Sequence, residues 1–172
     1  MTTRRVIPRE PRQVQQRDQR QAQRQQPRTQ PLVPSAPDAE RALIGSLLIA
    51  GADAALVDEC ARMIDHTSFL NPAWACAWRS IWRRAGSGEA FDVVLVSEDC
   101  ERDEEWPQGA APMSVLFHAA EGAETVAYAT WYAKEVADRA YQRRVTSTAA
   151  TLAAKAYQHD GSQADLAAAI AH

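Results

Sequence analysis

Lys134 and Lys155 are the only lysines in the 172-residue chain, and neither of them follows a glycine. A P-loop needs GxxxxGK followed by Ser or Thr, because its backbone amides and its lysine together hold phosphates. Nucleotide hydrolysis by that route is therefore excluded, and no GxSxG or HExxH motif occurs. We expect no catalytic activity in this chain, no cofactor and no small-molecule substrate.

Residues that could ligate a metal are present, but their spacing does not suit a metal site. Cys60, Cys76 and Cys100 form no CxxC pair, and the four histidines show no ligand spacing. An odd number of widely spaced cysteines also argues against a disulfide framework, so we expect small, buried thiols. The acidic residues between positions 98 and 105 are adjacent rather than convergent, which favours a solvated face. We therefore expect no bound metal.

Arginine is concentrated at the N-terminus, where it could contact phosphates. Residues 1–37 contain eight arginines against Glu10 and Asp18, a balance of +6, whereas the remainder has 11 basic and 20 acidic residues, a balance of −9. Arginines without competing acids can neutralise phosphates without reading sequence. The alternative is a solvated tail whose charge only aids solubility. The candidate phosphate contacts are Arg4, Arg5, Arg9, Arg12, Arg17, Arg20, Arg24 and Arg28.

Two further groups of side chains could contact a partner. Trp74, Trp78 and Trp82 are spaced four apart and could stack on bases, but such platforms need positive charge beside them. The neighbouring arginines are expected mostly off that face, so we favour core packing for the tryptophans. A second basic cluster could bind nucleic acid or an acidic partner surface, and partner contact is favoured because the surrounding residues are acidic. This cluster consists of Arg139, Arg143 and Arg144.

Apolar residues at helical spacing divide the chain after residue 37 into seven expected helices. Asp, Asn and Pro mark most of the helix starts and Gly marks several ends. Ser35 or Asp38 can cap the first helix. The segment 91–96 would form a strand by propensity alone, but no second strand exists to pair with it, so a short helix is expected. The expected helices begin near Asp38, Asp53, Asn71, Asp92, Pro112, Thr125 and Ala164.

The sixth of these helices is unusually long. No Gly or Pro occurs from Thr125 to about Tyr157, which predicts roughly 33 helical residues and a length of ~50 Å. Its apolar stripe is narrow and consists mostly of small residues. A small head cannot cover a helix of that length, so part of it should project or pair with another helix. The helix from Ala164 could fold back on it as a hairpin.

Four segments, in order, resemble the N-terminal domain of DnaB-type replicative helicases. Residues 37–48, Pro-Asp-Ala-Glu-Arg-Ala-Leu-Ile-Gly-Ser-Leu-Leu, look like its opening, and Phe-Leu-Asn-Pro at 69–72 with Ile-Trp at 81–82 matches its Phe-x-x-Pro segment and following helix. Gly-Glu-Ala-Phe-Asp at 88–92 is similar to its Gly-x-x-Ile-Asp turn. Tyr132 to Val136, with the arginines up to Arg144, resembles the start of its hairpin helix.

This resemblance implies a fold and a division of the chain. We expect an all-α protein with a disordered Arg/Gln/Pro-rich arm at 1–36 and a helical domain at 37–172. The domain would consist of a compact head, 37–122, and a helical hairpin, 123–172. Departures from the family are Leu95 in place of threonine, Gly-Ala-Ala at 109–111 in place of Gly-Gly, and the basic arm. No apolar run could span a bilayer and the N-terminus is not a secretory signal, so we expect a cytoplasmic protein.

The resemblance implies ring assembly through the hairpin and docking of a primase or a loader. The leading hypothesis is a module that self-associates as a dimer or higher ring, or binds a replicative helicase or primase, as adaptor, regulator or inhibitor. A second is the N-terminal portion of a truncated or split helicase whose ATPase is elsewhere. A third is non-specific DNA binding by the basic arm. The expected partner contacts are Tyr132, Arg139, Arg143 and Arg144.

Overall fold

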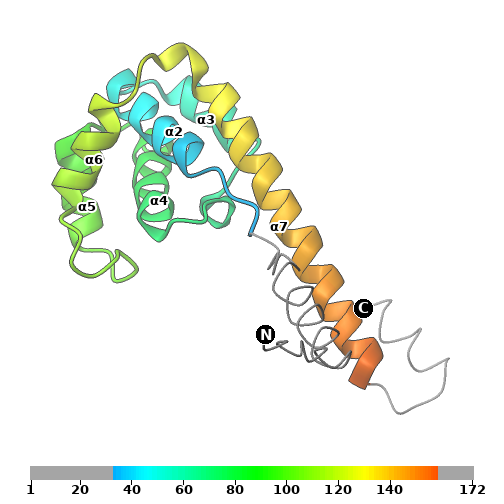
Figure 1. The fold of residues 1–172 in the computed structure, drawn as a ribbon. Helices are drawn as coiled ribbons and strands as arrows, with labels where there is room; N and C mark the ends of the chain where they lie inside the picture. The colour runs from blue at the N-terminus through cyan, green and yellow to red at the C-terminus, as the bar shows by residue number, and fades with distance from the viewer. Residues whose placement is uncertain (1–32, 159–172) are drawn as a thin grey trace, which may run out of the picture. The chain divides into compact units, whose positions relative to one another are not determined.

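A computed structural model of the chain describes residues 33–158, and within this range every regular element is helical (Figure 1). The expectation of an all-α fold is thereby confirmed. The basic arm up to residue 32 and the helix expected from Ala164 lie outside the described residues. The elements are α2 Pro37–Ala50, α3 Ala54–Ala61, the 3-10 turn η1 His66–Ser68, α4 Pro72–Gly86, α5 Val93–Glu101, α6 Pro112–Glu121, the 3-10 turn η2 Val126–Tyr128 and α7 Ala129–Gln158.

Side-chain caps start three of the helices at the expected positions. Asp53 accepts a hydrogen bond from the amide of Leu56, 3.0 Å away, and Asn71 accepts one from Ala73, with Pro72 at the first helical position. The expected cap of α2 is wrong, because this helix begins at Pro37 after Ala36 with no side-chain cap. Proline at the first helical position lacks one of the amides that a helix start leaves unpaired, and its φ is fixed near the helical value.

The ambiguous segment after Phe91 is the helix α5, as expected. Asp92 has extended backbone and accepts a hydrogen bond of 2.8 Å from the amide of Leu95, which satisfies one of the helix's free N–H groups. Val96 and Cys100, four residues apart, are both buried. The helical spacing of these side chains fills the core without requiring a neighbouring strand.

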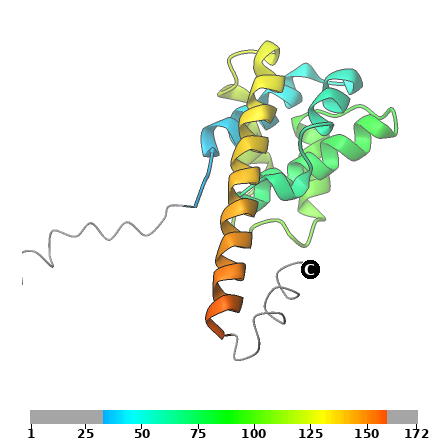
Figure 2. The same ribbon diagram turned by 90° about the vertical axis from the view of Figure 1, so that its right-hand side faces the viewer.

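The head, residues 37–122, is assembled around α2. Leu43, Ile44 and Leu47 of this helix are fully buried, and α2 packs against α4, α6 and α7 (Figures 1 and 2). Gly45 permits the close approach of α6, because a Cβ placed there would lie 2.1 Å from the carbonyl oxygen of Ala119. Only glycine fits this crossing without a shift of backbone.

A buried carboxylate joins α2 to the start of α4. The Glu40 residue is 1% exposed, and its two oxygens accept hydrogen bonds from the backbone amides of Leu70 and Asn71 at 2.8 and 3.1 Å. These bonds compensate for the removal of the carboxylate from water. Glu40 therefore fixes the loop from which α4 starts, in addition to lying in the first turn of α2.

The long helix α7 has 30 residues, which corresponds to ~45 Å at 1.5 Å per residue. Its first part packs on the head through Ala129, Ala133, Val136 and Ala140, all of which are buried. Beyond Ala140 the described residues are exposed or at most half-buried. The helix accordingly runs along the head and then projects past it, as both views show (Figures 1 and 2).

All three cysteines lie free and buried in the head. Burial raises the pKa of Cys60 and of Cys76 to about 11 and that of Cys100 to about 12. At neutral pH these thiols are protonated and therefore poor nucleophiles. In the described part of the chain, no helix is both long and apolar enough to cross a membrane.

Candidate interaction surfaces

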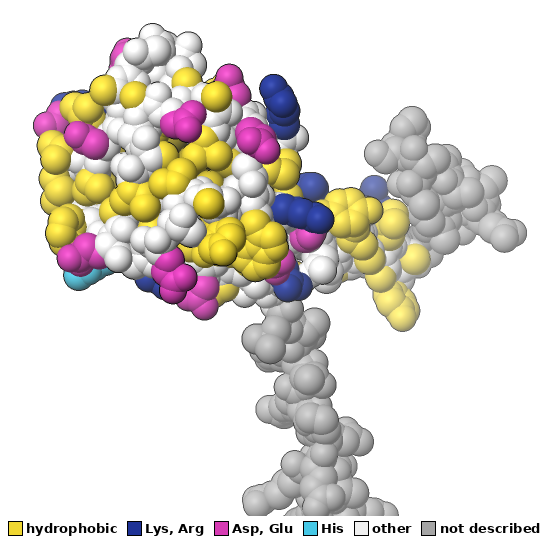
Figure 3. All heavy atoms as spheres, turned by 90° about the horizontal axis from the view of Figure 1, so that it is seen from above, with side chains coloured by type: hydrophobic (Ala, Val, Ile, Leu, Met, Phe, Trp, Pro, Cys, Tyr) yellow, Lys and Arg dark blue, Asp and Glu magenta, His cyan; other side chains and the backbone are white. Residues whose placement is uncertain are grey.

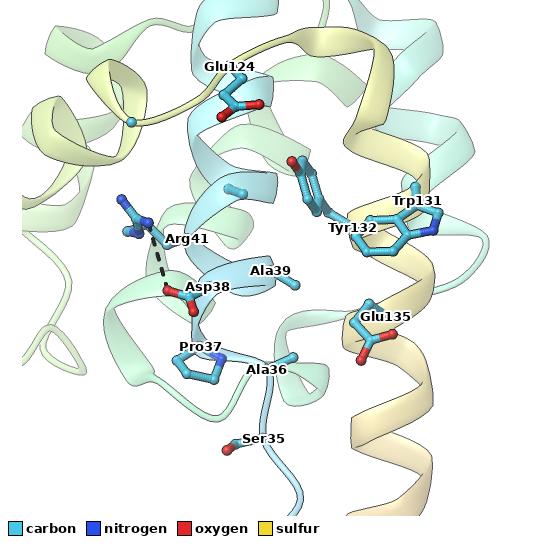
Figure 4. Close-up of a pocket in the computed structure, with 12 residues that line it drawn as sticks. Ser35, Ala36, Pro37, Asp38, Ala39, Arg41, Glu124, Trp131, Tyr132 and Glu135 are labelled. Atoms are coloured by element: carbon cyan, nitrogen blue, oxygen red, sulfur yellow. Dashed lines mark ion pairs between the residues drawn. The ribbon is translucent and has the colours of Figure 1, made fainter.

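A pocket of about 600 Å³ lies between the N-terminal part of α2 and the start of α7 (Figure 4). The loop that follows α6 contributes Glu124 to one side of the pocket, and α7 contributes Trp131, Tyr132 and Glu135. The opposite wall is the segment from Ser35 to Ala42. Tyr132, expected as a contact residue, therefore lines a concavity near the start of the long helix.

Aromatic rings form one side of this pocket. Tyr132 is half-buried and stacks edge-on against Trp131 and Tyr128, with ring centroids 5.4 and 6.5 Å apart. Trp131 is 61% exposed although it is the larger ring. The three rings also line a second, smaller pocket on the same side of α7. Trp131 was not among the contact residues expected from the sequence, although a Trp-Tyr pair with glutamates on both sides could have indicated an aromatic, acidic surface.

The second basic cluster divides into residues with different surroundings. Arg139 pairs with Glu135 one turn earlier, at 2.7 Å. Arg143 donates hydrogen bonds to the carbonyl oxygen of Pro34 at 3.0 Å and to that of Ser68. Arg144 lies 6.0 Å from the centre of the Tyr141 ring. Arg143 therefore ties α7 to two segments of its own chain, whereas Arg144 stays on the exposed side of the helix.

The projecting part of α7 presents apolar side chains to solvent. Tyr141 and Tyr157 are 62% and 91% exposed, and Val145 is 50% exposed. Figure 3 shows hydrophobic and basic side chains exposed side by side along this helix, and acidic side chains around a hydrophobic area of the head. Tyr141 and Val145, four residues apart, lie on the same face of the helix, and exposed apolar side chains in this arrangement are typical of a surface that pairs with another chain.

The tryptophan row is only partly in the core. Trp74 and Trp78 are buried as expected, but Trp82 is 55% exposed. Arg79 and Arg83 line a pocket together with Trp82, which corrects the expectation that they lie mostly off that face. Both guanidinium groups are paired with carboxylates, however, so they supply little free positive charge for a nucleic-acid phosphate.

Two of the acidic residues between positions 98 and 105 are not on a solvated face, in contrast to the expectation. Asp99 and Asp103 are half-buried and pair with arginines of α4: Asp99 with Arg84 at 2.7 Å and with Arg83, Asp103 with Arg79 at 2.7 Å. Burial by itself would raise the pKa of Asp99, but hydrogen bonds from Arg84 and Ser80 lower it to about 2. The pairs of Asp99 join α4 to α5, and the pair of Asp103 joins α4 to the loop that follows α5. Among the described residues no group of His, Cys, Asp or Glu is arranged to hold a metal ion.

The chain thus has a helical head that continues into one long projecting helix. The family model described as the DnaB-like helicase N-terminal domain matches residues 33–138, and the chain belongs to this family. The N-terminal domain of DnaB is not the catalytic ATPase part of the helicase. The resemblance inferred from the four ordered segments is therefore confirmed.

A solved structure shares this fold. The crystal structure of the N-terminal domain of DnaB helicase from Mycobacterium tuberculosis matches with a TM-score of 0.67 and 23% sequence identity, and the match covers 80% of this chain and 94% of that one. No curated protein sequence matches the chain.

Proposed function

We propose that this chain is a non-catalytic protein–protein interaction module of DNA replication, which self-associates or binds a replicative helicase or primase as adaptor, regulator or inhibitor. The observation that carries the proposal is the projecting part of α7, whose apolar side chains have no cover from the head. Family membership supports a role beside a helicase. We propose cytoplasmic action on the same basis.

The proposed contact surface is the exposed side of α7. Of the four residues expected from the sequence, Arg144 belongs to the projecting surface, together with Tyr141 and Val145. Tyr132 and Arg139 would take part nearer the head. Arg143 would act by holding α7 in place, because its guanidinium already bonds to Pro34 and Ser68.

Light scattering of the full chain tests self-association. We expect a mass of two or more chains, and we expect the double variant Tyr141→Glu/Val145→Glu to run as a single chain. Val94→Glu is the matched control, because Val94 is also 50% exposed but lies on α5. The proposal would be contradicted if the chain is a strict monomer and a pull-down with it recovers neither helicase nor primase.

A second candidate is the N-terminal portion of a split replicative helicase. It is favoured by the family match to a helicase domain in a sequence that lacks a P-loop lysine. In that case the chain would form a stable complex with a separate RecA-type ATPase and raise its DNA-unwinding rate. Unwinding that does not change when the chain is added would exclude this candidate.

A third candidate is non-specific DNA binding by the basic arm, which its eight arginines favour. Replacing all eight by glutamine in the full chain should weaken binding to duplex DNA and flatten its salt dependence, because fewer counterions are released. Unchanged affinity in 50 mM and 200 mM salt would rule out the arm as the binding element.

A further inference from the structure

The pocket between α2 and α7 combines two features that favour a positively charged ligand over an anionic or an apolar one. One is a pair of aromatic rings, Trp131 and Tyr132, that lie across its α7 side (Figure 4). The other is a set of carboxylates from three different segments: Asp38 on α2, Glu124 on the loop after α6, and Glu135 on α7. Ring faces and carboxylates both attract positive charge.

The carboxylates of this pocket retain capacity for a further cation. Arg41, the only basic residue of the lining, contacts Asp38 at 3.8 Å, a long distance for an ion pair on an exposed surface. Both contacts from Arg139 to Glu135 go to Oε1, which leaves Oε2 outside that pair. Glu124 is exposed and takes part in no ion pair among residues 33–158.

We propose that this pocket binds the guanidinium group of an arginine presented by a basic protein segment. Arginine fits best because its planar group stacks on an indole and can donate to two carboxylates at once. Nucleic acid fits poorly, since the three carboxylates would repel its phosphates. The inference deepens the proposed function and rests on it in one respect, namely that the ligand belongs to a protein.

Calorimetric titration of the full chain with a Gly-Arg repeat peptide tests the pocket. We expect Trp131→Ala to weaken binding about threefold to tenfold, in line with a cation–π contact at a partly exposed site. Trp82→Ala is the matched control, because Trp82 is 55% exposed against 61% for Trp131 but lies on α4. Equal losses in both variants would overturn the proposal.

Charge is tested by two further substitutions. The double variant Glu124→Gln/Glu135→Gln should bind several-fold more weakly and with less dependence on salt. A peptide with citrulline in place of arginine keeps the shape but loses the charge, and should not bind measurably. Citrulline peptide that binds as tightly as the arginine peptide would also overturn the proposal.

A variant in which the eight arginines before residue 33 are replaced by glutamine tests whether the chain's own arginines occupy the pocket. If this variant binds the peptide more tightly than the parent, the chain's own arginines compete for the pocket; if its affinity is unchanged, they do not occupy it and the pocket is free for an arginine of another protein. Both results support guanidinium recognition. Light scattering of Trp131→Ala separates this proposal from self-association, because a multimer that persists in that variant leaves the proposed function intact.

Discussion

Asp99 is the residue on which most polar contacts between α4 and α5 converge. Its carboxylate accepts hydrogen bonds from Ser80 at 2.6 Å and from Arg84 at 2.7 and 3.0 Å, and it also pairs with Arg83. The Asp99 side chain is 15% exposed and that of Arg84 is 13% exposed, so solvent screens this contact less than it does the outer pairs.

We expect Asp99→Asn to lower the free energy of unfolding by about 2 kcal/mol at pH 7, which is the energy that corresponds to the lowered pKa. A carboxyl whose pKa is lower in the folded state stabilises the fold above its unfolded pKa and loses that effect as the pH falls. The difference in the free energy of unfolding between variant and parent should therefore become smaller from about pH 5 towards pH 2. Urea denaturation of both proteins at several pH values measures this difference.

Glu101→Gln, on the exposed side of the same helix, is the control for this prediction and should leave stability unchanged. A gap between parent and Asp99→Asn that is the same at pH 7 and at pH 2.5 would show that Asp99 does not act through its charge.

At the scale of helices, the crossing of α2 and α6 depends on Gly45. We expect Gly45→Ala to destabilise the fold by about 1–3 kcal/mol, because the added Cβ would meet the backbone of Ala119, which outweighs the higher helix propensity of alanine. Gly86→Ala in α4 is the matched control: apart from the neighbouring residues of its own helix, no atom lies within 4 Å of the added Cβ, so this variant should be neutral or slightly stabilising. Thermal unfolding of both variants distinguishes these outcomes.

Elements that depend on local chemistry could be predicted from the sequence. The helix α5 followed from Asp92, whose side chain satisfies a helix amide, and α7 followed from the absence of Gly and Pro over some thirty residues. Tyr132 was identified by its place in the family's hairpin helix, and the structure places it in the pocket beside Trp131. The role of the four predicted contact residues stays a prediction.

Features that depend on tertiary geometry could not be predicted. Side chains four apart on a helix are offset by about 40°, so over eight residues the row from Trp74 to Trp82 turns away from the core by about 80°. The pairing of Arg79 with Asp103 joins residues 24 apart and depends on how α5 docks on α4. The carboxylates around Trp131 likewise come from segments that meet only in the folded chain.

At the scale of the whole domain, the head and the projecting helix should differ in local stability. We expect amides of α7 before Ala140 to exchange hydrogen slowly and those after Arg144 to exchange quickly in dilute, monomeric protein, because the latter have no packing to protect them. When hydrogen–deuterium exchange is measured at increasing protein concentration, only the amides after Arg144 should exchange more slowly. Exchange that is uniform along α7 in the monomer would contradict this expectation.

Because all three cysteines are buried, the folded chain should be almost unreactive towards thiol reagents. An additional cysteine introduced on α7 away from Tyr141 and Val145, for example Ser147→Cys at an exposed position, would consequently be the one site that a maleimide dye labels in the folded protein. Distances between dyes on neighbouring chains could then be measured without removing any native residue. Pulsed labelling of the three native thiols would report, on the same sample, how often the head opens.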